Sequence, residues 1–86
     1  KIEVRMKIPR GKGTWPAFWM LGENLFDAGI GWPKCGEIDI MEHGQDFNNV
    51  GSAIHTEKYN HTIGTQLTDT YLIDDYDTDF HTYGFE

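Results

Sequence analysis

The sequence predicts an all-β protein, and three observations lead to this fold class. Residues 1–8 alternate apolar and polar side chains at every position, the pattern of a strand with one buried face. Further short apolar runs are separated by segments rich in glycine and proline, as in sandwiches and barrels. No segment has the apolar spacing of an amphipathic helix. We favour a sandwich, because two-faced strands need one face covered and leave the other available.

The first half of the chain contains two expected strands. Residues 1–8 read KIEVRMKI, and Pro9 ends this strand. Residues 14–21 read TWPAFWML, an apolar run short enough for a buried strand, and Pro16 suits its start. Residues 22–34 are expected to form a loop, in which ENLFDA can make one helical turn.

The second half contains three more. Residues 36–43 form an acidic strand, and residues 49–56, NVGSAIHT, are its expected antiparallel partner. Residues 58–67 are polar and predicted to form a loop, and residues 79–86, DFHTYGFE, form a final strand.

Length and charge narrow the function. With 86 residues the chain is one domain at most, and both ends lie in expected strands, so residues 1–86 are predicted to be part of a larger domain. A single cysteine excludes an internal disulfide, and no apolar run has membrane-spanning length. The net charge of −7, from 7 basic and 14 acidic residues, argues against nucleic-acid and anionic-membrane partners. A group of aspartates is read as a solvated acidic loop, with a calcium loop as the minor alternative: Asp69, Asp74, Asp75, Asp77 and Asp79.

The segment CGEIDIMEHG places three carboxylates, Glu37, Asp39 and Glu42, in a strand otherwise made of Ile, Ile and Met. Glu37 and Asp39 share a face because side chains alternate along a strand. Glu42 lies at an odd offset from Glu37 and would point the other way in a regular strand. A β-bulge at Ile40–Met41 would restore the parity, so we predict a bulge there and all three acids on one face.

Three roles would justify such a cluster, because carboxylates repel one another and are costly to bury. One is a calcium site, and one is a solvated polar face. The third is glycoside hydrolysis, which uses a pair of carboxyl groups at the scissile bond. Spacing alone leaves all three open.

The motif GEIDIME resembles the catalytic signature Glu-x-Asp-x-x-Glu of glycoside hydrolase family 16. The segments EVRMKIP, GTWPAFWMLGEN, GWPKCGEIDIMEH and FHTYGFE are similar, in this order, to further segments of the laminarinase-like members. The resemblance implies a jelly-roll β-sandwich whose concave sheet forms an open cleft for a polysaccharide. The chain would then be a partial catalytic domain, containing the catalytic strand and part of the cleft sheet.

Carried over position by position, Glu37 is the expected nucleophile, Glu42 the general acid/base and Asp39 the assisting acid. The bulged signature resembles the laminarinase type, which implies a retaining endo-glycosidase acting on β-1,3-glucan. Alternatives are a hydrolase of a galactan (agarase or carrageenase type) or of mixed-linkage glucan, and a non-catalytic β-glucan-binding protein. The chemistry would need no cofactor, and a structural calcium would lie outside this chain. We expect a monomer with a polysaccharide as its partner, located outside the cell or in the periplasm because the substrate is a polymer.

Four residues are predicted to bind the substrate. Trp32 lies in the loop before the acidic strand, where it can stack on a sugar or cap the sandwich edge, and the resemblance favours stacking. His55 shares a face with Ala53 and is expected in the cleft. Arg5 and Glu3 lie on the polar face of the first strand, which is either cleft floor, as the resemblance implies, or a solvated charged face.

The remaining candidates are assigned mainly structural roles. Trp15 and Trp19 share a face by parity, and we place both in the core by default. His81 is either a core histidine or a hydrogen-bond partner within the acid cluster. His43 and His61 are predicted to lie on the surface, and Cys35 is predicted to be a buried thiol.

Overall fold

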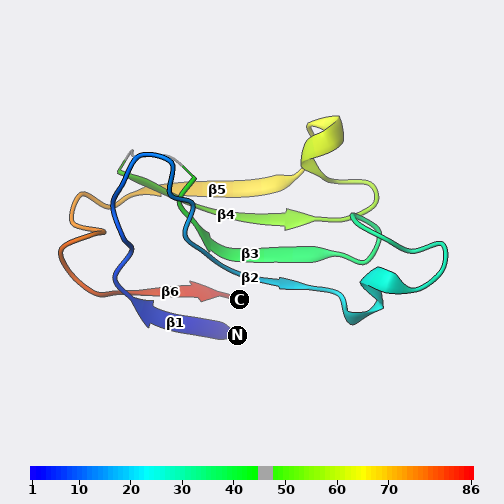
Figure 1. Cartoon of the computed structure of the whole chain (residues 1–86), viewed down its shortest axis with the longest axis horizontal. Coiled ribbons are helices and arrows are strands. Elements are labelled where there is room, and N and C mark those ends of the chain that lie inside the picture. The colour runs from blue at the N-terminus through cyan, green and yellow to red at the C-terminus, as the bar shows by residue number, and fades with distance from the viewer. Residues whose placement is uncertain (45–47) are drawn as a thin grey trace.

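The computed structural model describes residues 1–44 and 48–86, and this part of the chain is built from β-strands (Figure 1). The strands are β1 (Ile2–Met6), β2 (Ala17–Leu21), β3 (Glu37–Glu42), β4 (Asn49–His55), β5 (Leu67–Leu72) and β6 (His81–Phe85). The helices are single 3-10 turns, η1 (Glu23–Phe26) and η2 (His61–Ile63). The predicted all-β class is confirmed. No helix in the described ranges is long and apolar enough to cross a membrane.

The strands form two antiparallel sheets. Strands β2, β3, β4 and β5 follow one another in a four-stranded sheet, and β1 pairs with β6. Figure 1 shows the blue N-terminal strand beside the red C-terminal strand, so segments at opposite ends of the chain lie together. Strands β2 to β5 keep their sequence order in the sheet, as is common because strands consecutive in the chain usually lie side by side.

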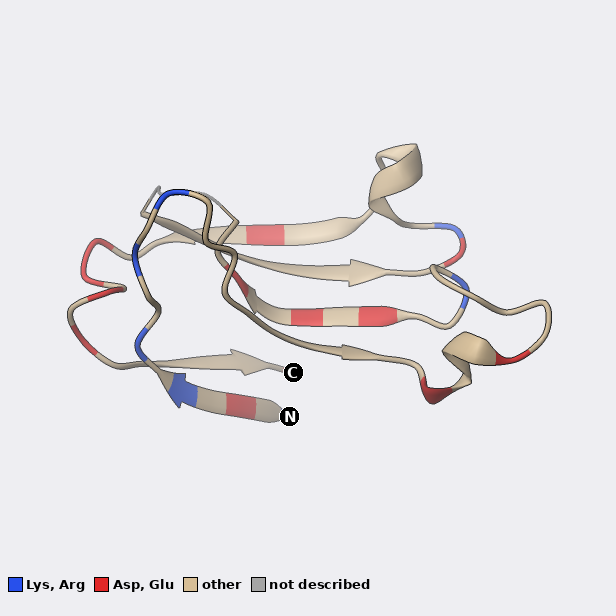
Figure 2. Ribbon diagram, viewed as in Figure 1, with Lys and Arg blue, Asp and Glu red and all other residues tan. Residues whose placement is uncertain are grey.

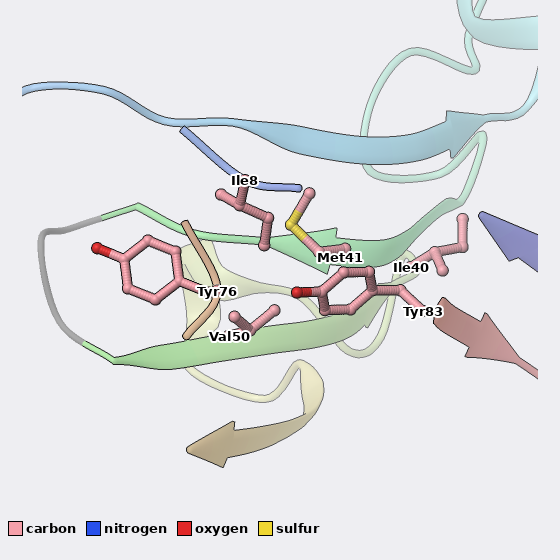
Figure 3. Packing of buried hydrophobic residues seen from close by; sticks show 6 residues of the cluster. All are labelled: Ile8, Ile40, Met41, Val50, Tyr76 and Tyr83. Atoms are coloured by element: carbon pink, nitrogen blue, oxygen red, sulfur yellow. The ribbon is translucent and has the colours of Figure 1, made fainter. Parts of the chain in front are cut away.

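The core lies where the two sheets meet (Figure 3). Its buried side chains are Ile8, Ile40, Met41, Val50, Tyr76 and Tyr83. The apolar residues of β1 pack against this cluster, which confirms the alternation read from residues 1–8. Burial of each large apolar side chain contributes about 1.5–3 kcal/mol. Because Ile38 and Ile40 of β3 face this core, the intervening Asp39 faces the opposite side of the four-stranded sheet.

One strand was not predicted. Residues 67–72 form β5 at the edge of the sheet, with every residue exposed, whereas the sequence suggested a loop that ends at Leu67 and an acidic loop after it. The sequence LTDTYL shows no apolar face. Both faces of this edge strand are exposed, so neither has to be apolar. Asp69 is therefore a strand residue that pairs with Ser52 of β4.

The other aspartates of the acidic group have partners of their own. Asp77 bonds to Arg10 at 2.8 Å, and Asp74 accepts a hydrogen bond from Asn48 at 3.0 Å. Asp75 bonds to His81 at 2.8 Å, so the carboxylate partner of His81 comes from the acidic loop and not from the acids of β3. In the described residues no group of three or more His, Cys, Asp or Glu side chains is arranged to hold a metal ion.

Candidate active site

The three acids of β3 lie on one face because the strand carries the predicted bulge. On β2, the partners of Glu42, Asp39 and Glu37 are residues 17, 19 and 21; on β4 they are residues 51, 53 and 55. Both sets advance by two, so each set lies on one face of its strand. Two residues of β3 lie between Asp39 and Glu42, whereas only Ser52 lies between their partners on β4, which confirms the bulge at Ile40–Met41. The carbonyl of Ile40 accepts a hydrogen bond from Ser52 Oγ at 2.9 Å.

The acidic row has no lysine or arginine neighbour on the strands of its own sheet. Strands β2, β3, β4 and β5 contain no Lys or Arg, and Figure 2 shows the acids of β3 in line along a sheet free of basic residues. Burial first, and then the hydrogen bonds and negative charges of Glu37 and Glu42, raise the pKa of Asp39 from 3.8 to about 8. Asp39 therefore holds a proton at neutral pH and adds no third negative charge between the two glutamates.

His55 of β4 completes the support of Asp39. Its Nε2 lies 3.3 Å from Asp39 Oδ2, and both side chains are buried. Its Nδ1 is also buried and has no hydrogen-bond partner in the described part of the chain. The predicted position of His55 beside the acids agrees with the β3–β4 register, in which it opposes Glu37.

Trp32 contacts the first acid of the row. Its indole Nε1 donates to Glu37 Oε2 at 2.5 Å. Its ring lies 4.9 Å from the ring of His61 and 5.7 Å from that of His55, measured between centroids. The loop that carries His61 is held by Asn60, whose buried side chain donates to the carbonyls of residues 56 and 57 and accepts from the amide of residue 62. The orientation of Trp32 is thus fixed from two sides.

Trp15 contacts the last acid of the row. Its indole Nε1 donates to Glu42 Oε1 at 3.3 Å, and the side chain is 69% exposed. The acids line a pocket together with side chains from the segment before β2, from β4, from η2 and the connection that follows it, and from the start of β5. The lining residues are Trp15, Glu37, Asp39, Glu42, Ala53, His55, His61, Gln66 and Thr68.

Arg5 and Glu3 do not belong to this pocket. They lie on β1 in the two-stranded sheet, on the face opposite the apolar residues that pack into the core. The Arg5 guanidinium lies 4.6 Å from the centroid of Phe80, and Glu3 bonds to Lys1 at 2.9 Å. Their expected place on the cleft floor is wrong, because alternation identifies the polar face of a strand but not the sheet to which the strand belongs.

The default placement of Trp15 and Trp19 in the core is also wrong. Trp19 is 49% exposed and pairs with Asp39, so it lies on the acid face. The core side of β2 is formed by Phe18 and Met20. His43 was expected at the surface but is buried, with its ring 4.4 Å from that of Tyr76.

Three side chains near the acids were not predicted there from the sequence, namely Trp19, His61 and Gln66. Only the position of Trp19 has a signal in the sequence. The position of Trp19 follows once Phe18 is assigned to the core, since the two alternate. His61 and Gln66 come from the connection between β4 and β5, where no periodicity applies, so only the tertiary structure brings them to the acids. Cys35 is half-buried, and its Sγ contacts the carbonyl of Gly36 at 3.5 Å.

Comparison with known proteins agrees with this geometry. Residues 2–82 match the family model described as "XgeA-like, catalytic GH16 domain". A beta-glucanase from Rhodothermus marinus is 44% identical over 87 residues, which cover 100% of this chain and 30% of that protein. A glucan endo-1,3-beta-glucosidase from Cryptopygus antarcticus is 39% identical over 90 residues, which cover 100% of this chain and 32% of that protein.

The solved structures lead to the same family. The laminarinase from Rhodothermus marinus superposes with a TM-score of 0.85 at 44% identity, covering 94% of this chain and 33% of that one. The chain therefore spans about a third of the length of the relatives it matches. The expected jelly-roll class is supported by this superposition. The family match over almost the whole chain, together with the bulged acidic row, means that the chain belongs to glycoside hydrolase family 16.

Proposed function

We propose that the protein hydrolyses β-1,3-glucan with retention of configuration, by double displacement at the acidic row. Glu37 is the nucleophile, Glu42 the general acid/base and Asp39 the assisting acid. The observation that carries the proposal is the row itself: two glutamates with a protonated aspartate between them, on one face of a bulged strand.

The spacing of the row supports retention rather than inversion. Asp39 lies between Glu37 and Glu42 on the shared face, and the charges of both glutamates raise its pKa, so a single carboxyl group separates the two glutamates. Retaining glycosidases have their carboxyl groups about 5–5.5 Å apart, while inverting enzymes need about 6.5–9.5 Å to admit a water molecule. The two glutamates of this row have one carboxyl group between them, which agrees with the shorter spacing of retaining enzymes.

The chemistry proceeds in two steps. In the first, a Glu37 oxygen attacks the anomeric carbon while Glu42 gives its proton to the departing glycosidic oxygen, and a covalent glycosyl–enzyme forms. In the second, Glu42 takes a proton from water, and the resulting hydroxide displaces Glu37 from the sugar. The proton on Asp39 donates to Glu37 and stabilises it when it leaves as a carboxylate. Carboxyl groups of this chain carry every step.

The substrate assignment rests on the relatives and on charge. Two of the proteins matched over the full chain are named beta-glucanase and glucan endo-1,3-beta-glucosidase. The sheet that bears the acids has no Lys or Arg, which disfavours a sulfated galactan. We assign sugar contacts to Trp32 and His55. Because the substrate is a polymer, we further propose that the protein acts as a monomer outside the cell or in the periplasm.

The test is an assay of the full-length protein on laminarin, lichenan, agarose and carrageenan, with Glu37→Gln as the inactive control. We expect release of sugar from laminarin, an initial product with the β-configuration by NMR, and a loss of about 10³-fold or more in the variant. An early fall in viscosity would indicate endo action. Release from a galactan alone would overturn the substrate, an α-configured product would overturn retention, and binding without release would favour the non-catalytic alternative.

A further inference from the structure

We propose that Trp15 is a positioning residue for Glu42. The indole N–H of Trp15 gives different tasks to the two oxygens of the Glu42 carboxyl group. The proposal rests on the proposed function, because it takes Glu42 as the acid/base. The indole nitrogen can donate a hydrogen bond but cannot accept one. The Glu42 oxygen that receives it, Oε1 at 3.3 Å, must present a lone pair. The carbonyl oxygen of a protonated carboxyl group is a stronger acceptor than its hydroxyl oxygen, so this hydrogen bond favours the transferable proton on the other oxygen, from which it passes to the glycosidic oxygen.

The backbone is built to bring Trp15 to this place. The β2–β3 ladder ends at the pair of Ala17 and Glu42, and one further hydrogen bond joins the His43 amide to the Pro16 carbonyl at 3.0 Å. This bond extends the pairing beyond the strands and carries Trp15 alongside Gly44.

Gly44 gives the indole the room that it needs. A Cβ added at Gly44 would lie 3.1 Å from Trp15 Cε2, closer than ordinary van der Waals contact. Any other residue would press on the ring and shift it relative to Glu42. The hydrogen bond and the missing side chain are separate observations, and both concern the position of the same ring.

The other end of the row has the same arrangement, which gives a matched comparison. Trp32 donates to Glu37 Oε2, so one oxygen of the nucleophile is held and the other is left to attack the sugar. Each glutamate therefore has one oxygen bound by an indole. The two tryptophans hold glutamates with different tasks in the first step, because Glu37 attacks the sugar and only Glu42 transfers a proton to the leaving group.

The decisive experiment compares two substrates in the full-length protein. Laminari-oligosaccharides have an alcohol leaving group that requires protonation, whereas a 2,4-dinitrophenyl β-laminaribioside has a leaving group that does not. The specificity constant kcat/KM reports the first, glycosylation step for both. For Trp15→Phe, which keeps an aromatic ring and removes the donor, we expect kcat/KM to fall about 10-fold on the oligosaccharide and to fall several-fold less on the aryl glycoside.

Three further variants make the result specific. Trp32→Phe should lower kcat/KM on both substrates, because the nucleophile acts on each. Gly44→Ala keeps the tryptophan but displaces it, and should reproduce the selective loss on the oligosaccharide. Glu42→Gln should show the same selectivity with a larger loss. If Glu42→Gln is selective but Trp15→Phe loses kcat/KM equally on both substrates, or on neither, the role of Trp15 is overturned. A Glu42→Gln variant without selectivity would overturn the acid/base assignment itself.

Discussion

Replacing Asp39 by asparagine should make the stability of the protein less sensitive to a rise in pH. The Asp39 side chain is 2% exposed, and burial and the neighbouring glutamates raise its pKa from 3.8 to about 8. In the unfolded chain the same group titrates at its ordinary pKa. Between these two values the native state holds a proton that the unfolded state has lost, so the stabilisation present below pH 3.8 is lost progressively as the pH rises toward 8.

The size of the effect follows from linkage. One proton of difference changes the free energy of unfolding by about 1.4 kcal/mol per pH unit. From pH 5 to pH 7, inside the window set by the two pKa values, the wild-type protein should lose about 3 kcal/mol through Asp39. Asparagine resembles the protonated acid in shape and stays neutral, so Asp39→Asn should not lose this amount.

Urea unfolding of the two proteins at pH 5, 6 and 7 measures the difference directly. The stability of the wild type relative to Asp39→Asn should fall by about 3 kcal/mol over this range. Asp27→Asn, which alters an exposed carboxylate in a loop, controls for the amide substitution itself. Parallel curves for the wild type and Asp39→Asn would mean that Asp39 is already ionised in the native protein. The account of the acidic row given above would then be refuted.

Two further substitutions test the elements that hold the site. Ser52→Ala removes the donor to the Ile40 carbonyl at the bulge, and should lower the free energy of unfolding by about 1 kcal/mol and reduce kcat, because the bulge orients Glu42. Asn60→Ala leaves two carbonyls and an amide of its loop without their partner. It should destabilise the protein by about 2–3 kcal/mol and raise KM, because His61 would no longer support Trp32; thermal unfolding and steady-state kinetics measure both effects.

Each of these variants has a matched control. Thr68→Val removes a hydroxyl that donates to the Ser52 carbonyl from an exposed position, and should change both stability and kcat less than Ser52→Ala. Asn48→Ala removes an exposed asparagine with a single bond to Asp74, and should leave KM unchanged. Equal effects in variant and control would contradict the specific roles given to the bulge and to the η2 loop.

The sequence by itself determined the fold class and the arrangement of the acids. Strict alternation identified the core face of β1, because side chains of a strand point to opposite sides in turn. The same rule made Glu42 inconsistent with Glu37 unless an extra residue intervened, and the structure contains that bulge at Ile40–Met41. These conclusions depend only on local geometry, which a short segment specifies completely.

The tertiary structure decided which face is which and what surrounds the acids. Parity placed Trp15 and Trp19 together, but the packing of Phe18 against the opposite sheet was needed to turn them toward the site. Parity also separated Arg5 from the core, yet the pairing of β1 with β6 places it in the other sheet. His61 reaches Trp32 through a loop, and the proton on Asp39 depends on burial and on two neighbouring charges. Such contacts join segments distant in sequence or depend on the surrounding dielectric, and neither is encoded in the period of a strand.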